Sequence, residues 1–164
     1  MKVVDIEWRA GADRFDVRGG SGVVASIDAP RTDPLSRSVG PGPAEMLLAA
    51  AGTCSAWDVV EILAKQRQAI SAIGVRVEGE QDADPPWPFR RIAIRFTVAG
   101  RDLDPDRVAR AVQLSESRYC AVIATIRGVS DVVVTCDTVE EGGDLGEDVA
   151  VSPSASVPAA DEGM

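Results

Sequence analysis

The stretch from Pro43 to Gln68 constrains the fold most, because it has the composition of one long and almost wholly apolar helix. Pro43 suits the first helical position, where no N–H is needed, and Glu45 suits the positive end of a helix. From Met46 to Val60 apolar residues occur on nearly all sides, whereas a surface helix carries them on one face. The stretch approaches membrane-spanning length but is interrupted by polar and charged side chains, namely Thr53, Ser55, Asp58 and Glu61. We therefore predict a soluble central helix around which the rest of the chain packs.

Alternating apolar and polar residues predict strands on both sides of this helix. Residues 2–28 contain three short strands joined by glycine-containing turns, and residues 132–139 form the last strand. Residues 75–78 and 91–98 form a hairpin, whose connection is rich in the Asp and Pro residues that suit turns. The segment 29–42 is rich in Pro, Ser and Gly, so it is predicted to be a loop.

Two further helices are predicted between the hairpin and the last strand. Asp104 and Pro105 provide an N-cap and a first helical residue. The inward face of this second helix is predicted to consist of Val108, Ala111, Val112 and Ser115. The pattern then shifts, and a short third helix is predicted to begin near Cys120 and to end at Gly128. The resulting order, βββ-α-ββ-αα-β, segregates strands from helices and indicates an α+β fold.

The net charge of −9 is concentrated at the C-terminal end of the chain. Residues 140–164 hold seven acidic residues and no Lys or Arg, so residues 1–139 carry 19 acidic and 17 basic side chains, a net charge of −2. We predict one folded domain, residues 1–139, followed by an acidic and disordered tail, residues 140–164. Neither part has the basic stripe that binds nucleic acid, so no nucleic-acid partner is expected.

Histidine is absent from the chain, and its absence limits the chemistry of the three cysteines. Histidine is the usual base for a nucleophile and the commonest transition-metal ligand, and three thiols without a C-x-x-C motif are a poor zinc set. No metal is therefore expected, and a reactive thiol must depend on an arginine, a carboxylate, a helix N-terminus or a second cysteine. The N-terminus lacks the features of a signal peptide, so we expect a cytoplasmic protein without a membrane partner.

Each cysteine has a structural and a chemical interpretation. Cys54 lies in an apolar helix, where free thiols often fill space, and Asp58 follows one turn later, so a cation from elsewhere would be needed to stabilise its thiolate. Cys120 lies at a predicted helix start, where the helix dipole favours a thiolate, with core packing as the alternative. Cys136 shares a strand face with Val132 and Val134 and is predicted to fill the core.

Three segments together resemble the superfamily of osmotically inducible protein C and organic hydroperoxide resistance proteins (OsmC/Ohr). They are GPGPAEMLLAAAGTCSAWDVVEIL, which contains Cys54, RDLDPDRVARAVQLSESRYCAVIATI, which contains Cys120, and the hairpin between them, IGVRVEGE with RRIAIRFTV. The order and spacing of these segments carry the resemblance. It covers residues 2–139 and is nearer to the OsmC-like branch of the superfamily.

The resemblance implies an intertwined homodimer that acts as a thiol-dependent peroxidase on organic hydroperoxides, without a metal or organic cofactor. Cys54 takes the position of the cysteine that attacks the peroxide and becomes a sulfenic acid. Cys120 takes the position of the cysteine that resolves it as a Cys54–Cys120 disulfide, which a dithiol such as a lipoyl group reduces. Glu45 matches the glutamate that opens the long helix, and Arg14 matches the N-terminal arginine, with Arg9 and Arg18 as competing positions.

Several interpretations stay open at this level. Nine residues separate Glu45 from Cys54, about two and a half turns, so Glu45 reaches Cys54 only across a dimer interface or through a bent first turn. Asp58 is expected to contact an arginine. Trp57 and Tyr119 are interpreted as packing residues, with the lining of an apolar pocket as the alternative for either. The alternative function is a non-enzymatic dimer that binds a small molecule or senses redox state. A third hypothesis is an interaction protein that works through the acidic tail.

Overall fold

The structure, a computed structural model, describes residues 1–9, 11–28 and 40–145. Their elements in chain order are β1 (Asp5–Arg9), β2 (Arg14–Arg18), β3 (Val24–Asp28), α1 (Pro43–Lys65), β4 (Ala69–Gln81), β5 (Phe89–Arg101), α2 (Pro105–Leu114), the π-helix η1 (Ser115–Tyr119), α3 (Ala121–Ile126) and β6 (Asp131–Glu140). This is the predicted α+β order, with a π-helix added between the second and third helices. Most of the predicted loop and tail, residues 29–39 and 146–164, lies outside the described residues.

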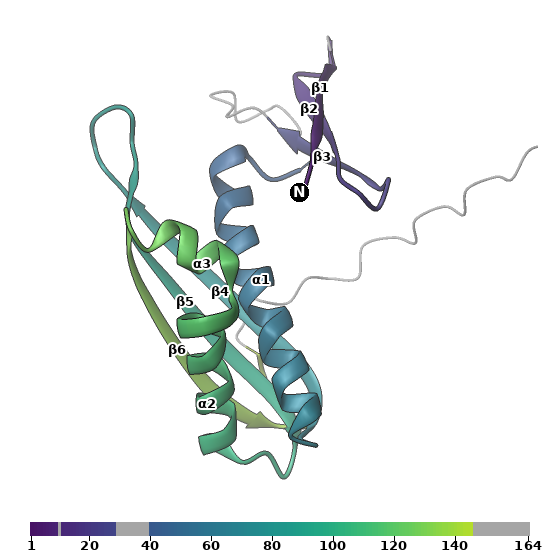
Figure 1. The fold of residues 1–164 in the computed structure, drawn as a ribbon, viewed down its shortest axis with the longest axis vertical. Helices are drawn as coiled ribbons and strands as arrows, with labels where there is room; N and C mark the ends of the chain where they lie inside the picture. The colour runs from purple at the N-terminus through teal and green to yellow at the C-terminus, as the bar shows by residue number, and fades with distance from the viewer. Residues whose placement is uncertain (10, 29–39, 146–164) are drawn as a thin grey trace, which may run out of the picture.

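The described strands form two separate sheets (Figure 1). β1, β2 and β3 make an antiparallel sheet, and β4, β5 and β6 make the second. β4 and β5 are the predicted hairpin, whereas β6 lies parallel to β5, with Cys136 opposite Phe96. Parallel neighbours require a crossover connection, and here the chain crosses through α2, η1 and α3. This crossover covers the same face of the second sheet as α1 does.

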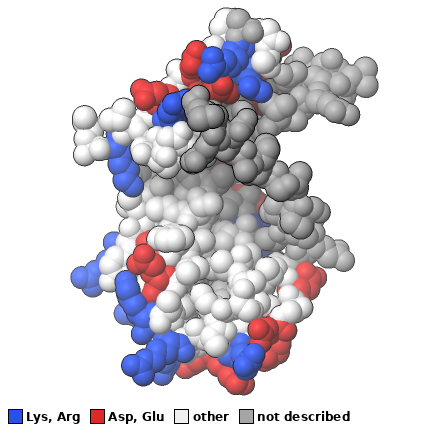
Figure 2. Space-filling view, turned by 90° about the vertical axis from the view of Figure 1, so that its right-hand side faces the viewer, with Lys and Arg blue, Asp and Glu red and all other residues white. Residues whose placement is uncertain are grey.

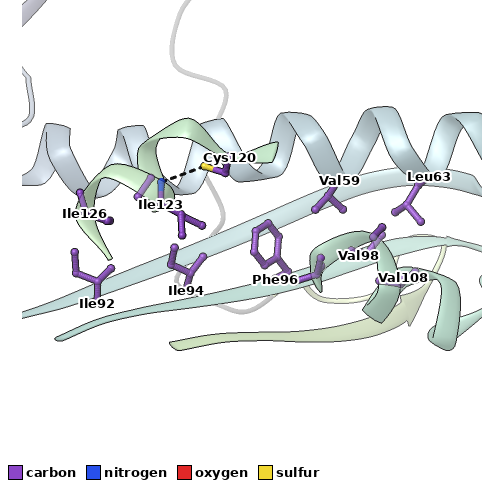
Figure 3. Packing of buried hydrophobic residues seen from close by; sticks show 13 residues of the cluster. Val59, Leu63, Ile92, Ile94, Phe96, Val98, Val108, Cys120, Ile123 and Ile126 are labelled. Atoms are coloured by element: carbon purple, nitrogen blue, oxygen red, sulfur yellow. Dashed lines mark hydrogen bonds between the residues drawn. The ribbon is translucent and has the colours of Figure 1, made fainter. Parts of the chain in front are cut away.

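The hydrophobic core lies between the second sheet and the helices (Figure 3). Phe96 of β5 and Val59 and Leu63 of α1 are fully buried there, and each such side chain contributes about 1.5–3 kcal/mol through its burial. Gly52 lets α1 approach β4 closely, because a Cβ at this position would lie 2.8 Å from Cγ2 of Val77. The helix that carries Cys54 is therefore held tightly against the sheet.

The start and inward face of α2 are as predicted from the sequence. The Asp104 side chain accepts hydrogen bonds from the N–H groups of Asp106 at 3.0 Å and of Arg107 at 3.3 Å, and Pro105 begins the helix. The four residues of the predicted inward face, Val108, Ala111, Val112 and Ser115, are all buried. A local cap and helical periodicity were sufficient to place this helix.

The prediction that the fold surrounds α1 is wrong for the single chain. The buried residues of α1 lie along one face, namely Ala51, Gly52, Ser55, Val59 and Leu63. On the other side Leu47 is 41% exposed and Trp57 is 68% exposed, so Trp57 does not pack in the core of the single chain. Figure 2 shows this side of the molecule as a broad uncharged surface with charged residues gathered toward its ends. By length and composition alone α1 is apolar enough to cross a membrane, but its buried face packs on the core of the protein.

The N-terminal sheet of β1, β2 and β3 lies beyond the N-terminal end of α1 (Figure 1). Every residue of β1 is exposed, including Ile6 at 66% and Trp8 at 58%. Within the described residues the strands of this sheet pack extensively only on one another. The sheet and the open side of α1 are thus two apolar surfaces that the single chain leaves uncovered, and contiguous exposed apolar surface of this kind marks interaction sites.

Candidate functional site

Cys54 and Cys120 come together where the crossover lies against the middle of α1. Cys54 is half-buried within α1, and Cys120 is 2% exposed at the N-cap of α3. The Cys54 thiol lies close enough to act on the ionisation of Cys120 through a side-chain hydrogen bond and through its charge. Both cysteines are free thiols in this structure. The sequence could not show whether residues so far apart in the chain meet, and the structure places them side by side.

The π-helix η1 sets the position of Cys120. The N–H of Cys120 donates to the carbonyl oxygen of Ser115 at 2.9 Å, a bond that spans five residues rather than the four of an α-helix. Cys120 itself has an extended backbone, and its sulfur accepts a hydrogen bond from the N–H of Ile123 at 3.4 Å (Figure 3). The shift of pattern predicted near Tyr119 is this wide turn, and the short helix begins directly after it, as predicted.

Burial governs the ionisation of Cys120. Burial raises the pKa of the Cys120 thiol, the N–H of Ile123 lowers it, and contact with Cys54 raises it again, which brings the pKa to about 11. The N–H groups at the helix start do favour the thiolate, as expected, but desolvation outweighs them, and Cys120 packs in the core as the alternative interpretation had it. At neutral pH Cys120 carries its proton. Cys54, the less buried of the two, is the thiol that a small molecule reaches more easily.

Ser115 ties the two cysteine-bearing segments together. Ser115 is 1% exposed, and its hydroxyl shares its single hydrogen between the Ser55 carbonyl oxygen at 3.1 Å and Oδ2 of Asp58 at 3.0 Å. Its own carbonyl oxygen holds the N–H of Cys120. The hydrogen-bond partner of Asp58 is thus a serine and not the expected arginine. Sequence reasoning placed Ser115 on the inward face of a helix but missed this function, for which the only signal was a polar residue among apolar ones.

Glu45 and Arg14 lie away from the cysteines in the single chain. Glu45 is exposed in the first turn of α1, where its Oε2 accepts a hydrogen bond from the N–H of Gly42 at 2.7 Å. Nε of Arg14 lies 3.2 Å from Oδ1 of Asp16 within the N-terminal sheet, but without hydrogen-bond geometry. Within the described residues, no hydrogen bond or ion pair joins Glu45 or Arg14 to Cys54. One chain therefore brings together two of the four predicted site residues.

Of the competing arginines, Arg9 is already engaged within the N-terminal sheet. Its Nε lies 2.8 Å from Oδ2 of Asp16, and its Nη1 lies 2.9 Å from Oε1 of Glu7. A hydrogen bond to Asp16 raises the pKa of Arg9, and the same bond lowers the pKa of Asp16. Arg9 thus has two carboxylate partners, whereas Arg14 has one poorly aligned partner.

A hollow of about 370 Å³ lies beside the C-terminal half of α1, and neither Cys54 nor Cys120 lines it. Asp58, one turn after Cys54, and Tyr119, directly before Cys120, both line it, together with Ile62 and Leu114. Tyr119 is 53% exposed and borders this hollow, so it does not fill the core, and its alternative interpretation as a pocket-lining residue is the one that fits. The lining thus mixes these apolar side chains with charged ones, since Glu61 and Lys65 also contribute to it.

Cys136 is separate from this pair. It lies on β6 opposite Phe96 and packs against the core beside Val132 and Val134, so the prediction that it fills space is confirmed. Burial raises its pKa, and the charge of Asp137 raises it further. In the described part of the chain no group of three or more Cys, Asp or Glu side chains is placed to hold a metal ion.

Comparison with known proteins identifies the family. The family model described as OsmC-like protein matches residues 35–135, which include both cysteines of the site. The chain belongs to the OsmC-like family. Protein YhfA of Escherichia coli is 49% identical to it over 82 residues, which are 50% of this chain and 61% of YhfA. The match therefore spans less than two thirds of this relative.

Solved structures of other proteins share the fold. A hypothetical protein of Aquifex aeolicus is 25% identical, with a TM-score of 0.74 over 86% of this chain and 98% of that chain. A protein of Legionella pneumophila described as an organic hydroperoxide resistance protein is 16% identical, with a TM-score of 0.61 over 84% of this chain and 96% of that chain. At this identity the second likeness shows the fold alone.

Proposed function

We propose that this OsmC-like protein is a thiol-dependent peroxidase that reduces organic hydroperoxides through Cys54 and Cys120 in the cytoplasm. The observation that carries the proposal is the pairing of a half-buried thiol on α1 with a fully buried, protonated thiol at the N-cap of α3. OsmC/Ohr proteins include thiol peroxidases, and the Legionella relative is described as an organic hydroperoxide resistance protein. The two positions match the attacking and resolving cysteines of that chemistry.

The reaction takes place in three balanced steps. The Cys54 thiolate attacks the terminal oxygen of the hydroperoxide, the O–O bond breaks, and with one proton the products are the alcohol and a sulfenic acid on Cys54. The sulfur of Cys120 then attacks the sulfur of Cys54, its proton leaves with the hydroxyl group as water, and a disulfide forms. A dithiol, with a lipoyl group as the proposed class, reduces the disulfide by thiol exchange and is itself oxidised to a cyclic disulfide.

The Cys120 environment suits the second of these steps. Only one of two adjacent thiols ionises readily, because two like charges at short distance oppose each other. Burial keeps the proton on Cys120, whereas Cys54 is only half-buried and is the more accessible of the two thiols. Once Cys54 has become a neutral sulfenic acid, its charge no longer opposes ionisation of Cys120, and the N–H of Ile123 is in place to stabilise the attacking sulfur.

A homodimer completes this proposed site. OsmC/Ohr proteins are typically dimers, and the single chain leaves the N-terminal sheet and one side of α1 uncovered. In the proposed dimer the sheet of one copy packs over α1 of the other, which covers Ile6, Trp8 and Trp57. The same exchange brings Arg14 of one copy toward Cys54 of the other, where the guanidinium stabilises the thiolate and the leaving oxygen. Glu45 then positions Arg14 across the interface.

The test is the mass-resolved thiol state after one equivalent of cumene hydroperoxide. Wild type is expected to form a Cys54–Cys120 disulfide, and Cys120→Ser is expected to stop at a sulfenic acid on Cys54. Cys136→Ser is the matched control and is expected to behave as wild type. Thiols that remain reduced in every variant would contradict the peroxidase and leave the non-enzymatic binding or redox-sensing dimer as the better proposal.

A further inference from the structure

The hollow of about 370 Å³ beside the C-terminal half of α1 is separate from the cysteine pair, because neither cysteine lines it. One wall consists of five residues of α1, namely Asp58, Glu61, Ile62, Lys65 and Gln66. Counted from the first of them, the others lie three, four, seven and eight positions on, which places all five on one side of the helix. Leu114 at the end of α2 and Tyr119 at the end of η1 form the wall on the crossover side. The volume is in the range of small-molecule sites.

Asp58 is the carboxylate of this hollow that lacks a cation. It is half-buried, its Oδ2 accepts the hydroxyl hydrogen of Ser115 at 3.0 Å, and within the described residues it forms no ion pair. Glu61 has both oxygens engaged, because Oε1 accepts a hydrogen bond from Nε1 of Trp57 at 3.1 Å and Oε2 lies 3.2 Å from Nζ of Lys65. Two carboxylates and one ammonium group therefore line the hollow, and its net charge is negative.

Gln66 adds an unpaired acceptor to the same wall. Its Oε1 is buried and accepts no hydrogen bond from the described residues, and a buried acceptor without a donor is costly. The hydrogen bonds of Gln66 within the described residues run through its backbone, whose N–H donates to the Ile62 carbonyl oxygen at 3.0 Å and whose carbonyl oxygen accepts from Arg107 at 3.4 Å. The side-chain amide is therefore free to turn toward a ligand in the hollow.

The spacing of these two polar groups sets the shape of an occupant. Asp58 and Gln66 are eight residues apart, which is about 12 Å along the helix axis, so one ligand atom does not reach both. Ile62 lies between them on α1, and Leu114 and Tyr119 face it with further apolar surface. An occupant that meets both polar groups is therefore elongated, with a cation at one end, an apolar middle and a hydrogen-bond donor at the other end.

We propose that this hollow binds an aromatic monoamine that carries a hydroxyl group at the end opposite its ammonium group. The ammonium group donates to Oδ1 of Asp58, a charge-assisted hydrogen bond of the stronger kind. The aromatic ring packs against Ile62 and Leu114, and the hydroxyl group donates to Oε1 of Gln66. This binding site is additional to the proposed peroxidase and does not rest on it.

The surroundings select against other cations. Oδ2 of Asp58 already accepts from Ser115, so one oxygen remains, whereas a guanidinium group binds best to two oxygens at once. A quaternary ammonium group has no N–H to donate. A second cation at the far end of the ligand would be repelled by Lys65, which lines that part of the hollow beside Gln66. A single primary ammonium group therefore fits best.

Isothermal titration calorimetry on the full chain tests this site, with tyramine as the probe. Two matched compounds each lack one recognised group: tyrosol has a hydroxyl group in place of the ammonium group, and phenethylamine lacks the phenolic hydroxyl group. Tyramine is expected to bind most tightly, phenethylamine more weakly and tyrosol most weakly. Asp58→Asn is expected to weaken tyramine binding at least about tenfold, because it removes the charge but keeps an oxygen for Ser115.

Two further variants separate loss of the site from loss of structure. Asp106→Asn is the matched control, because it removes the same charge from an exposed residue in the first turn of α2, outside the hollow, and its affinity is expected to equal that of wild type. Lys65→Gln is expected to strengthen tyramine binding by about two- to fivefold, because it removes the only cation among the described residues that line the hollow. Misfolding does not raise affinity, so this variant remains decisive if Asp58→Asn is unstable.

Four outcomes would overturn the proposal. The first is the absence of tyramine binding by wild type at millimolar concentration. The second is equal affinity for tyramine and tyrosol, since apolar contact alone would then account for binding. The third is an equal loss in Asp58→Asn and Asp106→Asn, which would reduce the effect to the overall charge of the protein. The fourth is unchanged or weaker binding by Lys65→Gln, which would place the amine elsewhere.

Discussion

Ser115 is the most informative residue to perturb, because one buried hydroxyl joins the two cysteine-bearing segments. Ser115→Ala removes the hydrogen bonds to the Ser55 carbonyl oxygen at 3.1 Å and to Asp58 Oδ2 at 3.0 Å. It keeps the backbone bond from Cys120 to residue 115 and leaves a cavity of only one oxygen atom. The cost is thus mainly that of the Asp58 carboxylate left without this donor, because the Ser55 carbonyl oxygen keeps its intrahelical partner in α1.

The size of this cost follows from the environment. Leaving a buried acceptor unsatisfied costs about 1–3 kcal/mol, and hydrogen bonds to charged groups lie toward the upper part of that range. Because Asp58 is half-buried and regains some hydration in the variant, we expect the free energy of unfolding to fall by about 1.5–2.5 kcal/mol. Urea denaturation measures this change, and an unaltered m-value would show that the native state remains compact.

Ser117→Ala provides the matched control. Ser117 lies on the same π-helix and donates to the Gln113 carbonyl oxygen at 2.7 Å, but it is exposed, so its loss is expected to cost under about 0.5 kcal/mol. A double-mutant cycle of Ser115→Ala with Asp58→Asn should give a coupling energy of about 0.5–3 kcal/mol. Equal stability of the two serine variants, or a coupling energy near zero, would refute the idea that Ser115 ties α1 to η1.

The effect on chemistry is separable from the effect on stability. If Ser115 holds the two thiols in register, Ser115→Ala slows formation of the Cys54–Cys120 disulfide while sulfenic acid still forms on Cys54. A displacement of about 1 Å in such a geometry costs about 100-fold in rate, so a decrease of ten- to a hundredfold is expected. Stopped-flow measurement of each step checks it, and equal slowing of both steps would show a general loss of structure instead.

Other consequences of the structure can be measured directly. Burial raises the pKa of Cys120 from its ordinary 9.0 to about 11, so above pH 9 the folded state retains a proton that the unfolded state releases. The free energy of unfolding should therefore be unchanged below pH 9 and fall as the pH rises toward 11. Cys120→Ser should lack this part of the pH dependence. Gly52→Ala should cost about 1–3 kcal/mol by urea denaturation, because its Cβ would lie 2.8 Å from Val77 Cγ2; a neutral result would show that α1 and β4 are less tightly packed. Trp57→Asp should shift the proposed dimer toward monomer in analytical ultracentrifugation, whereas Trp87→Asp, at an exposed loop residue, should not; a monomeric wild type would contradict the dimer.

Local signals in the sequence determined most of the elements. The cap at Asp104 and the proline after it located the start of α2, and helical spacing identified its four buried residues. Alternation located the β4–β5 hairpin and the inward face of Cys136, because side chains alternate between faces in any strand. These features depend only on neighbours in the chain, so no knowledge of the tertiary structure was needed.

Only the tertiary structure decided how those elements combine into a site. The contact of Cys54 with Cys120, the parallel pairing of β6 with β5, and the one-sided burial of α1 each depend on how distant segments pack. Two of the sequence-based expectations failed for this reason. Apolar residues around α1 indicated that it is covered, but they did not say whether by the same chain. The helix N-terminus at Cys120 indicated a thiolate, but the depth of burial, which no local pattern encodes, outweighed it.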